Sequence, residues 1–331
     1  MSTYRRIVLA SRPQGKLVPE NFRLEEAALP RPQEGEVAVR NIYLSIDPYM
    51  RARMDDVRSY APPQAIDSVM IGATAGEVMQ SHHPGFKPGD KVVGMLGWAE
   101  QGIAPGHALR KVDASRIPLQ AYLGAAGMPG ITAWYGIRQI LQPAAGETLV
   151  VSAATGAVGS IAAQLAKQSG CRVVGIAGGP QKCAHAIDIL GLDDCVDHRL
   201  PHLDERLAHS TPQGIDAVFE NVGGACLDSA IANANPHARI ALCGLIAGYD
   251  GEPLALAQVR NLVSMRIRLQ GFLITDHLDI WPQATAELAD LIATGKLRYH
   301  ETVKQGLEAA PQALADLLQG RNLGKQLVKL V

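Results

Sequence analysis

A turn of small residues at 153–160 constrains the fold of this chain more than any other sequence feature. It reads AATGAVGS, follows the apolar run LVVS, and precedes helix-forming residues at 161–167. Small side chains let the backbone of such a turn approach a phosphate, and the first N–H groups of the next helix face that anion. The spacing matches the dinucleotide-binding fingerprint G-x-G-x-x-G, with Ala154 at the first glycine position. The turn therefore predicts a dinucleotide site between a strand and a helix.

Strands and helices alternate from the turn onward. Predicted strands cover 149–152, 172–176, 195–197, 215–220 and 239–243, and predicted helices cover 157–168, 181–190 and 225–234. Alternation at these lengths is typical of βαβ units. It predicts an α/β fold with a Rossmann, doubly wound parallel sheet covered by helices on both faces.

The first part of the chain, up to about residue 120, reads instead as a β-rich segment between proline and glycine turns. The tail beyond the nucleotide-binding segment is too short to form a domain alone. We therefore predict that the tail returns to complete the first domain. Residues 1–124 and 296–331 would form a β-rich substrate and catalytic domain split in sequence, and residues 125–295 would form the coenzyme-binding Rossmann domain.

Composition excludes several classes of partner. The 331 residues carry a net charge of −1, which gives no reason to expect a nucleic-acid partner. No apolar stretch reaches the ~20 residues of a membrane-spanning helix, so no membrane partner is expected. The first residues lack the apolar core of a signal peptide, and a cytoplasmic protein is expected.

The cysteines predict that no metal is bound. There are five, none before Cys171, and no two have C-x-x-C spacing. A zinc alcohol dehydrogenase would need an early cysteine ligand, and its structural metal would need a cluster of four more. The cysteines are best interpreted as small buried side chains.

The residues after the second predicted strand favour NADPH over NADH. An acidic residue about 20 positions past the glycines would bind a ribose 2′-hydroxyl and repel a 2′-phosphate. Gly178 and Gly179 occupy that region instead, and no carboxylate occurs before Asp188. Lys182 can supply a positive charge to the phosphate, although its position at a helix start also suits an ordinary exposed lysine.

Seven segments, taken together, resemble one protein family. They are SIDPYMR at 45–51, GMPGITA at 127–133, AATGAVGS at 153–160, ENVGG at 220–224, CGLIAGY at 243–249, QGF at 270–272 and GRNLGK at 320–325. Their order resembles the zinc-independent medium-chain dehydrogenase/reductase superfamily. More closely, the chain is similar to its leukotriene/prostaglandin reductase branch, which includes alkenal/alkenone double-bond reductases.

The resemblance implies a fold and an activity. The split β-rich domain would be GroES-like. The reaction would be NADPH-dependent reduction of a carbon–carbon double bond conjugated to a carbonyl, with hydride going to the β-carbon and a proton to the α-carbon. The implied partners are a small conjugated carbonyl substrate and a second copy of the chain in a homodimer.

The resemblance also implies the site residues. Tyr249 would lie near the nicotinamide ribose and the substrate carbonyl, where a neutral phenol can donate a hydrogen bond. Tyr49 would line the substrate pocket. The implied coenzyme contacts are Met128, Thr132, Gly156, Ala157, Val158, Gly178, Lys182, His198, Asn221, Cys243, Gly244, Phe272 and Asn322.

One segment departs from the family pattern. The family often has a tyrosine near the 2′-phosphate, where this chain has Asp197, His198 and Arg199. His198 can donate a hydrogen bond and Arg199 adds a positive charge, whereas Asp197 would repel a phosphate. A weaker preference for NADPH than is usual in the family is therefore expected.

Two other functions remain open from the sequence. A quinone reductase would use the same NADPH site, because quinones also accept hydride. A non-catalytic NADPH-binding protein would keep the coenzyme residues without turnover.

Overall fold

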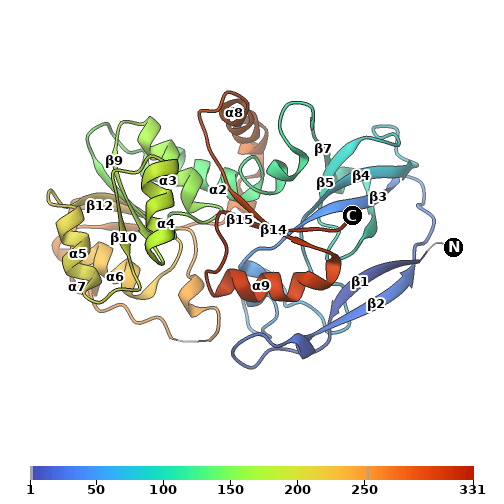
Figure 1. Ribbon diagram of the computed structural model, residues 1–331, viewed down its shortest axis with the longest axis horizontal. Coiled ribbons are helices and arrows are strands. Elements are labelled where there is room, and N and C mark those ends of the chain that lie inside the picture. Colours follow the sequence, from blue (N-terminus) through green and yellow to red (C-terminus); the bar gives the residue numbers. More distant parts are fainter. Residues whose placement is uncertain (1–2, 252) are drawn as a thin grey trace. The chain divides into compact units, whose positions relative to one another are not determined.

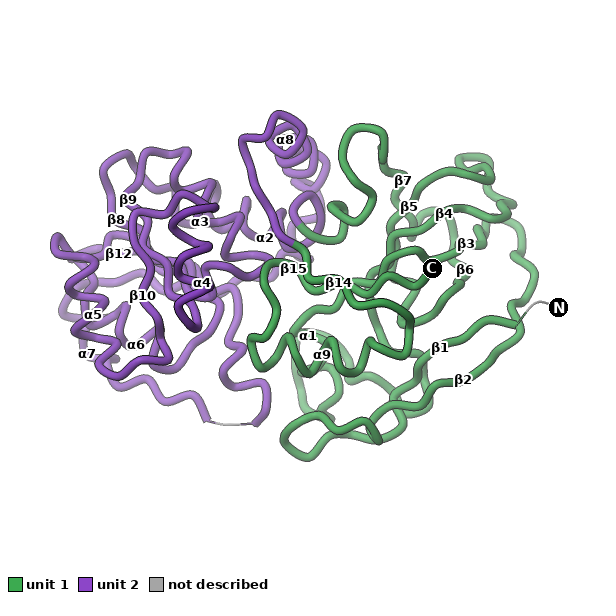
Figure 2. The backbone as a smooth tube through the Cα atoms, in the orientation of Figure 1, with its two compact units in different colours: residues 1–124, 301–331 green, residues 125–300 purple. Residues whose placement is uncertain are grey.

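The computed structural model describes residues 3–251 and 253–331, which form two compact units (Figure 2). Unit 1 comprises residues 1–124 and 301–331, and unit 2 comprises residues 125–300. Unit 1 is therefore made of two segments far apart in the sequence. No helix in the described ranges has both the length and the apolar character needed to cross a lipid bilayer.

Unit 2 is built on a six-stranded sheet in the order β10-β9-β8-β11-β12-β13. Figure 1 labels three of its strands, β9, β10 and β12. All neighbouring strands in the sheet are parallel. The strands are β8 (Thr148–Ser152), β9 (Arg172–Ala177), β10 (Asp194–Asp197), β11 (Ile215–Glu220), β12 (Ala234–Leu242) and β13 (Arg268–Gly271). Counted from β8, this is the order 3-2-1-4-5-6 of a Rossmann sheet, which reverses between β8 and β11. The predicted fold class is confirmed.

Helices cover both faces of this sheet. They are α2 (Met128–Tyr135), α3 (Gly159–Gln168), α4 (Pro180–Ala184), α5 (Leu203–Ser210), α6 (Gly224–Ala232), α7 (Val259–Ser264) and α8 (Trp281–Ala293). Successive residues of a strand point to opposite faces. Val218 of β11 packs in a core cluster with side chains of α5 and α6. Phe219 faces the segment after α2, where a Cβ on Gly136 would lie 2.3 Å from its ring. This two-sided burial explains the nearly continuous apolar runs of the central strands.

Unit 1 contains a mixed sheet that joins both of its segments. It has the order β14-β15-β3-β4-β5-β7, with β6 also paired to β3. Its strands are β3 (Glu36–Ser45), β4 (Thr74–Ser81), β5 (Lys91–Gly94), β6 (Gln101–Pro105), β7 (Leu109–Lys111), β14 (Glu301–Gln305) and β15 (Lys325–Lys329). The C-terminal strand β15 pairs antiparallel to β3, and β14 pairs parallel to β15. The tail thus supplies strands to a sheet that begins near the N-terminus.

A hairpin and two helices complete unit 1. The hairpin consists of β1 (Thr3–Leu9) and β2 (Phe22–Ala28), and the helices are α1 (Tyr49–Ala52) and α9 (Ala310–Leu318). The main core of the unit combines Ile7, Leu44, Met50, Trp98 and Leu314, all nearly inaccessible to solvent. Both sequence segments contribute to this core, so neither one buries it alone.

Candidate active site

The turn between β8 and α3 forms a tight loop at the carboxyl edge of the unit 2 sheet. Gly156 donates its N–H to the carbonyl of Ala153 at 2.8 Å, and α3 begins at Gly159. A Cβ on Gly159 would lie 2.3 Å from the carbonyl oxygen of Ala153, so only glycine fits there. The predicted phosphate-binding residues Gly156, Ala157 and Val158 are partly exposed in this loop. The loop can therefore present the N–H groups at the start of a 10-residue helix to a diphosphate.

Ala154 replaces the first glycine of the fingerprint, and strand β9 makes room for it. Its side chain is fully buried. A Cβ on Gly175 of β9 would lie 2.8 Å from the Cβ of Ala154. The N–H of Ala154 donates to the carbonyl of Ile176 at 3.1 Å, which holds the loop against β9. A glycine on the neighbouring strand thus compensates for the alanine in the loop.

Three basic side chains gather where β9 ends. A Cβ on Gly178 would lie 2.8 Å from Nε2 of His198 and 3.1 Å from Nε of Arg199. Burial, together with the charge of Arg199, lowers the pKa of Lys182. Burial also lowers the pKa of His198, aided by Arg199 and Lys182 and opposed by Asp197. Two positive groups, Lys182 and Arg199, together with an imidazole that can donate a hydrogen bond, suit a bound phosphate next to a residue without a side chain.

Asp197 anchors the loops of this basic cluster. Its Oδ1 accepts the N–H of Gly179 at 2.8 Å and the N–H of Arg199 at 3.0 Å. Burial alone would raise the pKa of Asp197, but these backbone donors and the nearby basic groups hold it below its usual value. The carboxylate therefore joins the loop after β9 to the loop after β10. This role was not evident from the sequence, which only indicated its charge.

Glu220 is a buried carboxyl group at the end of β11 that the sequence interpretation did not assign to the site. Its Oε1 accepts the hydroxyl of Ser152 at 2.8 Å and the N–H groups of Val222 at 2.6 Å and Gly223 at 2.7 Å. Its Oε2 has no hydrogen-bond partner among the described residues, and burial raises the pKa of Glu220. Glu220 thus joins the ends of β8 and β11, where the sheet order reverses.

Asn221, Cys243 and Gly244 lie at the same edge. The amide of Asn221 donates to the carbonyl of Ser152 at 2.7 Å. The N–H groups of Cys243 and Gly244 donate to the carbonyl of Glu220 at 2.9 and 3.2 Å. Burial, with the neighbouring carboxyl of Glu220, raises the pKa of Cys243 to about 12, so its thiol is uncharged at neutral pH. The loops after β11 and β12 are therefore fixed to each other and to β8.

Met128, Thr132 and Phe272 belong to unit 2 but are not part of these loops. The hydroxyl of Thr132 donates to the carbonyl of Met128 at 2.7 Å within α2. Phe272 follows β13, and its ring centre lies 5.6 Å from that of Tyr135 and 6.3 Å from that of Phe219. Phe272 is thus fixed by an aromatic group formed by the end of α2 and β11.

Tyr249 follows β12 in a short helical turn. Its N–H donates to the carbonyl of Ile246 at 3.2 Å, and its side chain is partly buried. The turn itself is held to the loop after β11, because the N–H of Ala247 donates to the carbonyl of Val222 at 3.0 Å. The phenol is therefore carried by the same connected set of loops as Asn221 and Cys243.

Tyr49 and Asn322 belong to unit 1. Tyr49 is the first residue of α1, and burial raises its pKa well above the usual value, as does the charge of Asp47. The phenol is therefore neutral throughout the physiological range. The buried amide of Asn322 donates to the carbonyl of Gly324 at 2.8 Å, as a turn-forming asparagine does.

The sheet topology brings most of the predicted coenzyme residues together. The loops after β8, β9, β10, β11 and β12 all leave the carboxyl ends of parallel strands, and these ends lie at one edge of the sheet. Dinucleotides bind at this edge, where the strand order reverses. The glycine loop, Gly178 and the basic side chains around it fit the diphosphate and the 2′-phosphate of NADPH.

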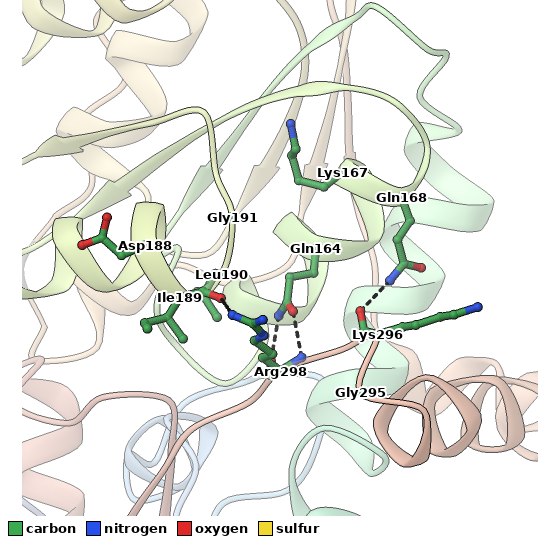
Figure 3. Close-up of a pocket in the computed structure, with 10 residues that line it drawn as sticks. All are labelled: Gln164, Lys167, Gln168, Asp188, Ile189, Leu190, Gly191, Gly295, Lys296 and Arg298. Carbon is green, nitrogen blue, oxygen red and sulfur yellow. Dashed lines mark hydrogen bonds between the residues drawn. The ribbon is translucent and has the colours of Figure 1, made fainter.

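A separate cavity of about 330 Å³ lies in unit 2, near the C-terminal end of α3 (Figure 3). Its lining residues are Gln164, Lys167, Gln168, Asp188, Ile189, Leu190, Gly191, Gly295, Lys296 and Arg298. Figure 3 shows the amide of Gln164 turned to the backbone of Arg298, with bonds of 2.7 and 2.8 Å. None of the predicted site residues lines this cavity, and its polar groups connect α3 to the segment that ends unit 2.

Two family models match the chain. One is described as the N-terminal domain of oxidoreductase and matches residues 5–112. The other is described as zinc-binding dehydrogenase and matches residues 157–293. Within residues 3–251 and 253–331, no three His, Cys, Asp or Glu side chains form a group that could hold a metal ion.

Known proteins are similar over most of the chain. NADPH-dependent curcumin reductase of Escherichia coli K12 is 46% identical, over 98% of this chain and 96% of that protein. The NADP(+)-dependent 2-alkenal reductase of Nicotiana tabacum is 41% identical, over 88% of this chain and 87% of that protein. The crystal structure of CurA from Vibrio vulnificus in complex with NADPH has a TM-score of 0.94 and 44% identity, and the match covers 99% of both chains.

Proposed function

This chain belongs to the zinc-independent medium-chain dehydrogenase/reductase family of alkenal/alkenone reductases, and from that premise we propose its reaction. It is an NADPH-dependent oxidoreductase that reduces the carbon–carbon double bond of α,β-unsaturated aldehydes and ketones. A 2-alkenal and curcumin, after which two relatives are named, both contain such a bond.

The observation that carries the coenzyme assignment is the basic cluster at the end of β9. His198 and Arg199 lie against Gly178, where an NAD-specific site would place an acidic side chain, and Lys182 is close enough to both to interact with them electrostatically. The loop of Gly156, next to the N-terminus of α3, would hold the diphosphate. Bound NADPH supplies the hydride that reaches the β-carbon of the substrate.

The protein's own part in the reaction is to orient the substrate and to stabilise charge. Negative charge develops on the carbonyl oxygen as the double bond is reduced, so a hydrogen-bond donor there lowers the barrier. We assign that donor to the phenol of Tyr249, which is carried by the loops connected to Asn221. We also assign a substrate contact to the phenol of Tyr49.

We also propose a range of substrates and an oligomeric state. Leu254 and Leu256, in the segment after Tyr249, are partly buried and favour apolar enals and enones, including prostaglandin- and leukotriene-like ketones. Met54, after α1, is fully buried in the core of unit 1 and makes no such contribution. We further propose that the protein acts in the cytoplasm as a homodimer, without a nucleic-acid or membrane partner.

A substrate panel tests the proposed function. NADPH oxidation is followed at 340 nm with an enal, an enone and a benzoquinone, and each is repeated with NADH. We expect kcat/KM to be higher for the enal and the enone than for the benzoquinone. With each of these two substrates, we expect kcat/KM to be higher with NADPH than with NADH. A benzoquinone preference would make the protein a quinone reductase, and no turnover with any acceptor would indicate a coenzyme-binding protein.

A further inference from the structure

A buried ion pair in unit 1 joins the C-terminal strand to the turn that carries Tyr49. Lys325, the first residue of β15, is 3% exposed, and Asp47 is 4% exposed. The ammonium of Lys325 donates to Oδ1 of Asp47 at 2.7 Å and to the carbonyl oxygen of Ile46 at 2.6 Å. The two residues are 278 positions apart in the sequence.

The contacts of this pair are concentrated on the segment between β3 and α1. The second carboxylate oxygen of Asp47 accepts the hydroxyl of Ser45. The carbonyl of Asp47 accepts the N–H of Met50 at 3.1 Å, which starts the turn of α1. Tyr49 lies within the turn that the Asp47 carbonyl closes, so the backbone position of Tyr49 depends on Asp47.

Two further residues of unit 1, Glu301 and Gly124, lie near Lys325. Glu301 of β14 is directly opposite Lys325 in the strand register, and each affects the other electrostatically. A Cβ on Gly124 would lie 3.3 Å from Cγ of Lys325, so the glycine leaves space for the lysine stem. Lys325 is therefore confined by β14, by the end of the first segment and by the Ile46 carbonyl.

Stability alone does not account for a pair of this kind. Removing two charges from water is costly, and apolar residues of similar size often give equal or greater stability. The ammonium, however, makes directional bonds to a backbone carbonyl and to a carboxylate within the same turn, which an apolar residue cannot do.

We propose that Lys325 is a positioning residue for the reaction, which fixes the turn at residues 46–49 so that the phenol of Tyr49 lies where the substrate contacts it. Asp47 provides the counter-charge and the second attachment. The inference rests on the proposed function, because it assumes that Tyr49 contacts the enone substrate.

The test compares Lys325→Met, Asp47→Asn and the double variant. Lys325→Met leaves the Asp47 carboxylate buried without its counter-charge, so this variant loses stability. The double variant removes both charges and should regain stability, but it still lacks the bond to the Ile46 carbonyl. Lys304→Met is the matched control, since Lys304 of the neighbouring strand β14 forms a more exposed ion pair with Asp316 of α9.

The expected result separates stability from activity. The double variant recovers the free energy of unfolding relative to Lys325→Met, while its kcat/KM for the enone stays about 10- to 100-fold below wild type. Its NADPH dissociation constant stays within about threefold of wild type. Lys304→Met retains wild-type kcat/KM.

A double-mutant cycle with Tyr49→Phe gives a readout that a purely structural role would not change. If Lys325 acts through Tyr49, Tyr49→Phe lowers kcat/KM less in the Lys325→Met/Asp47→Asn background than in wild type. Additive effects, or a double variant that regains both stability and activity, would show the ion pair to be structural only. Absence of enone reduction by wild type would refute the proposed function instead.

Discussion

At the residue scale, the proposed reaction depends on two tyrosines and on the basic cluster at the end of β9. Tyr249 and Tyr49 are neutral hydrogen-bond donors at pH 7 by the ordinary chemistry of phenols. Lys182 comes from α4, whereas His198 and Arg199 come from the loop after β10 and lie against Gly178. Substitutions at these positions therefore act on different steps of the reaction.

Tyr249→Phe removes the proposed donor to the carbonyl oxygen and keeps the ring. We expect kcat for an enone to fall about 100-fold, because a donor that acts on developing charge is lost. The dissociation constant of NADPH, measured by fluorescence titration, should change by no more than about threefold. Unchanged kcat would remove Tyr249 from the mechanism.

Lys182→Ala removes one positive charge from the basic cluster. We expect NADPH to bind about 10- to 100-fold more weakly and NADH to bind as before, since only NADPH carries the 2′-phosphate. Lys296→Ala, at an exposed lysine of the same unit, is the control. An equal loss of affinity for both coenzymes would contradict this assignment.

At this scale the sequence predicted which residue types occupy the site, but not which groups their side chains contact. Asp197 was expected to disfavour a phosphate, and the structure shows that its carboxylate binds two backbone N–H groups. Glu220 was overlooked because an acidic residue at the end of an apolar strand also suits the first position of a loop. Such roles depend on where a carboxylate points, and periodicity carries no information on that.

At the element scale, the sequence predicted the buried parallel strands well and the edge elements poorly. The strand predicted at 215–220 matches β11, and the helix predicted at 157–168 begins at Gly159. Strands β2 and β13 were not predicted, because each carries charged or polar residues on an exposed edge and lacks an apolar pattern. Helix α2 was also missed, since its sequence MPGITAWY contains proline and glycine.

The space that the Ala154 side chain occupies in the glycine loop should depend on the absence of a side chain at Gly175 of β9. Gly175→Ala places a methyl group 2.8 Å from the Cβ of Ala154, so we expect a loss of about 1–3 kcal/mol in the free energy of unfolding. Adding Ala154→Gly should restore part of that loss, as measured by denaturant titration. Additive losses in the double variant would contradict the proposed compensation.

Strand β14 should give the protein a pH-dependent stability. Burial raises the pKa of Glu301 from 4.5 to about 7, so the folded protein holds a proton that the unfolded chain releases. The stabilising contribution of Glu301 to the free energy of unfolding is therefore fully present below pH 4.5. It is lost as the pH rises through 7. The full shift corresponds to about 3 kcal/mol at most.

Comparison with Glu301→Gln isolates this contribution, because glutamine does not titrate. Between pH 5 and pH 8, wild type should lose free energy of unfolding relative to the variant, as measured by urea titration at each pH. A difference between the two proteins that stays constant over this range would show that Glu301 has an ordinary pKa.

At the scale of the whole molecule, the late position of the fingerprint was the most useful sequence signal. It predicted a nucleotide-binding unit placed within a split β-rich unit, and the tail strands β14 and β15 do join the sheet of β3. Residues 296–300 lie in unit 2, where the N–H of Arg298 donates to Gln164 of α3 at 2.8 Å. Side-chain to backbone bonds of this kind leave no pattern in the sequence.

If the protein reduces a carbon–carbon double bond with hydride from NADPH, the transferred atom must arrive on the β-carbon of the substrate. This is measured with NADPH deuterated at the transferable C4 position, a simple conjugated enone, and NMR of the product. We expect a saturated ketone with deuterium on the β-carbon and the carbonyl intact. An allylic alcohol with deuterium on the former carbonyl carbon, or no deuterated product at all, would contradict this expectation.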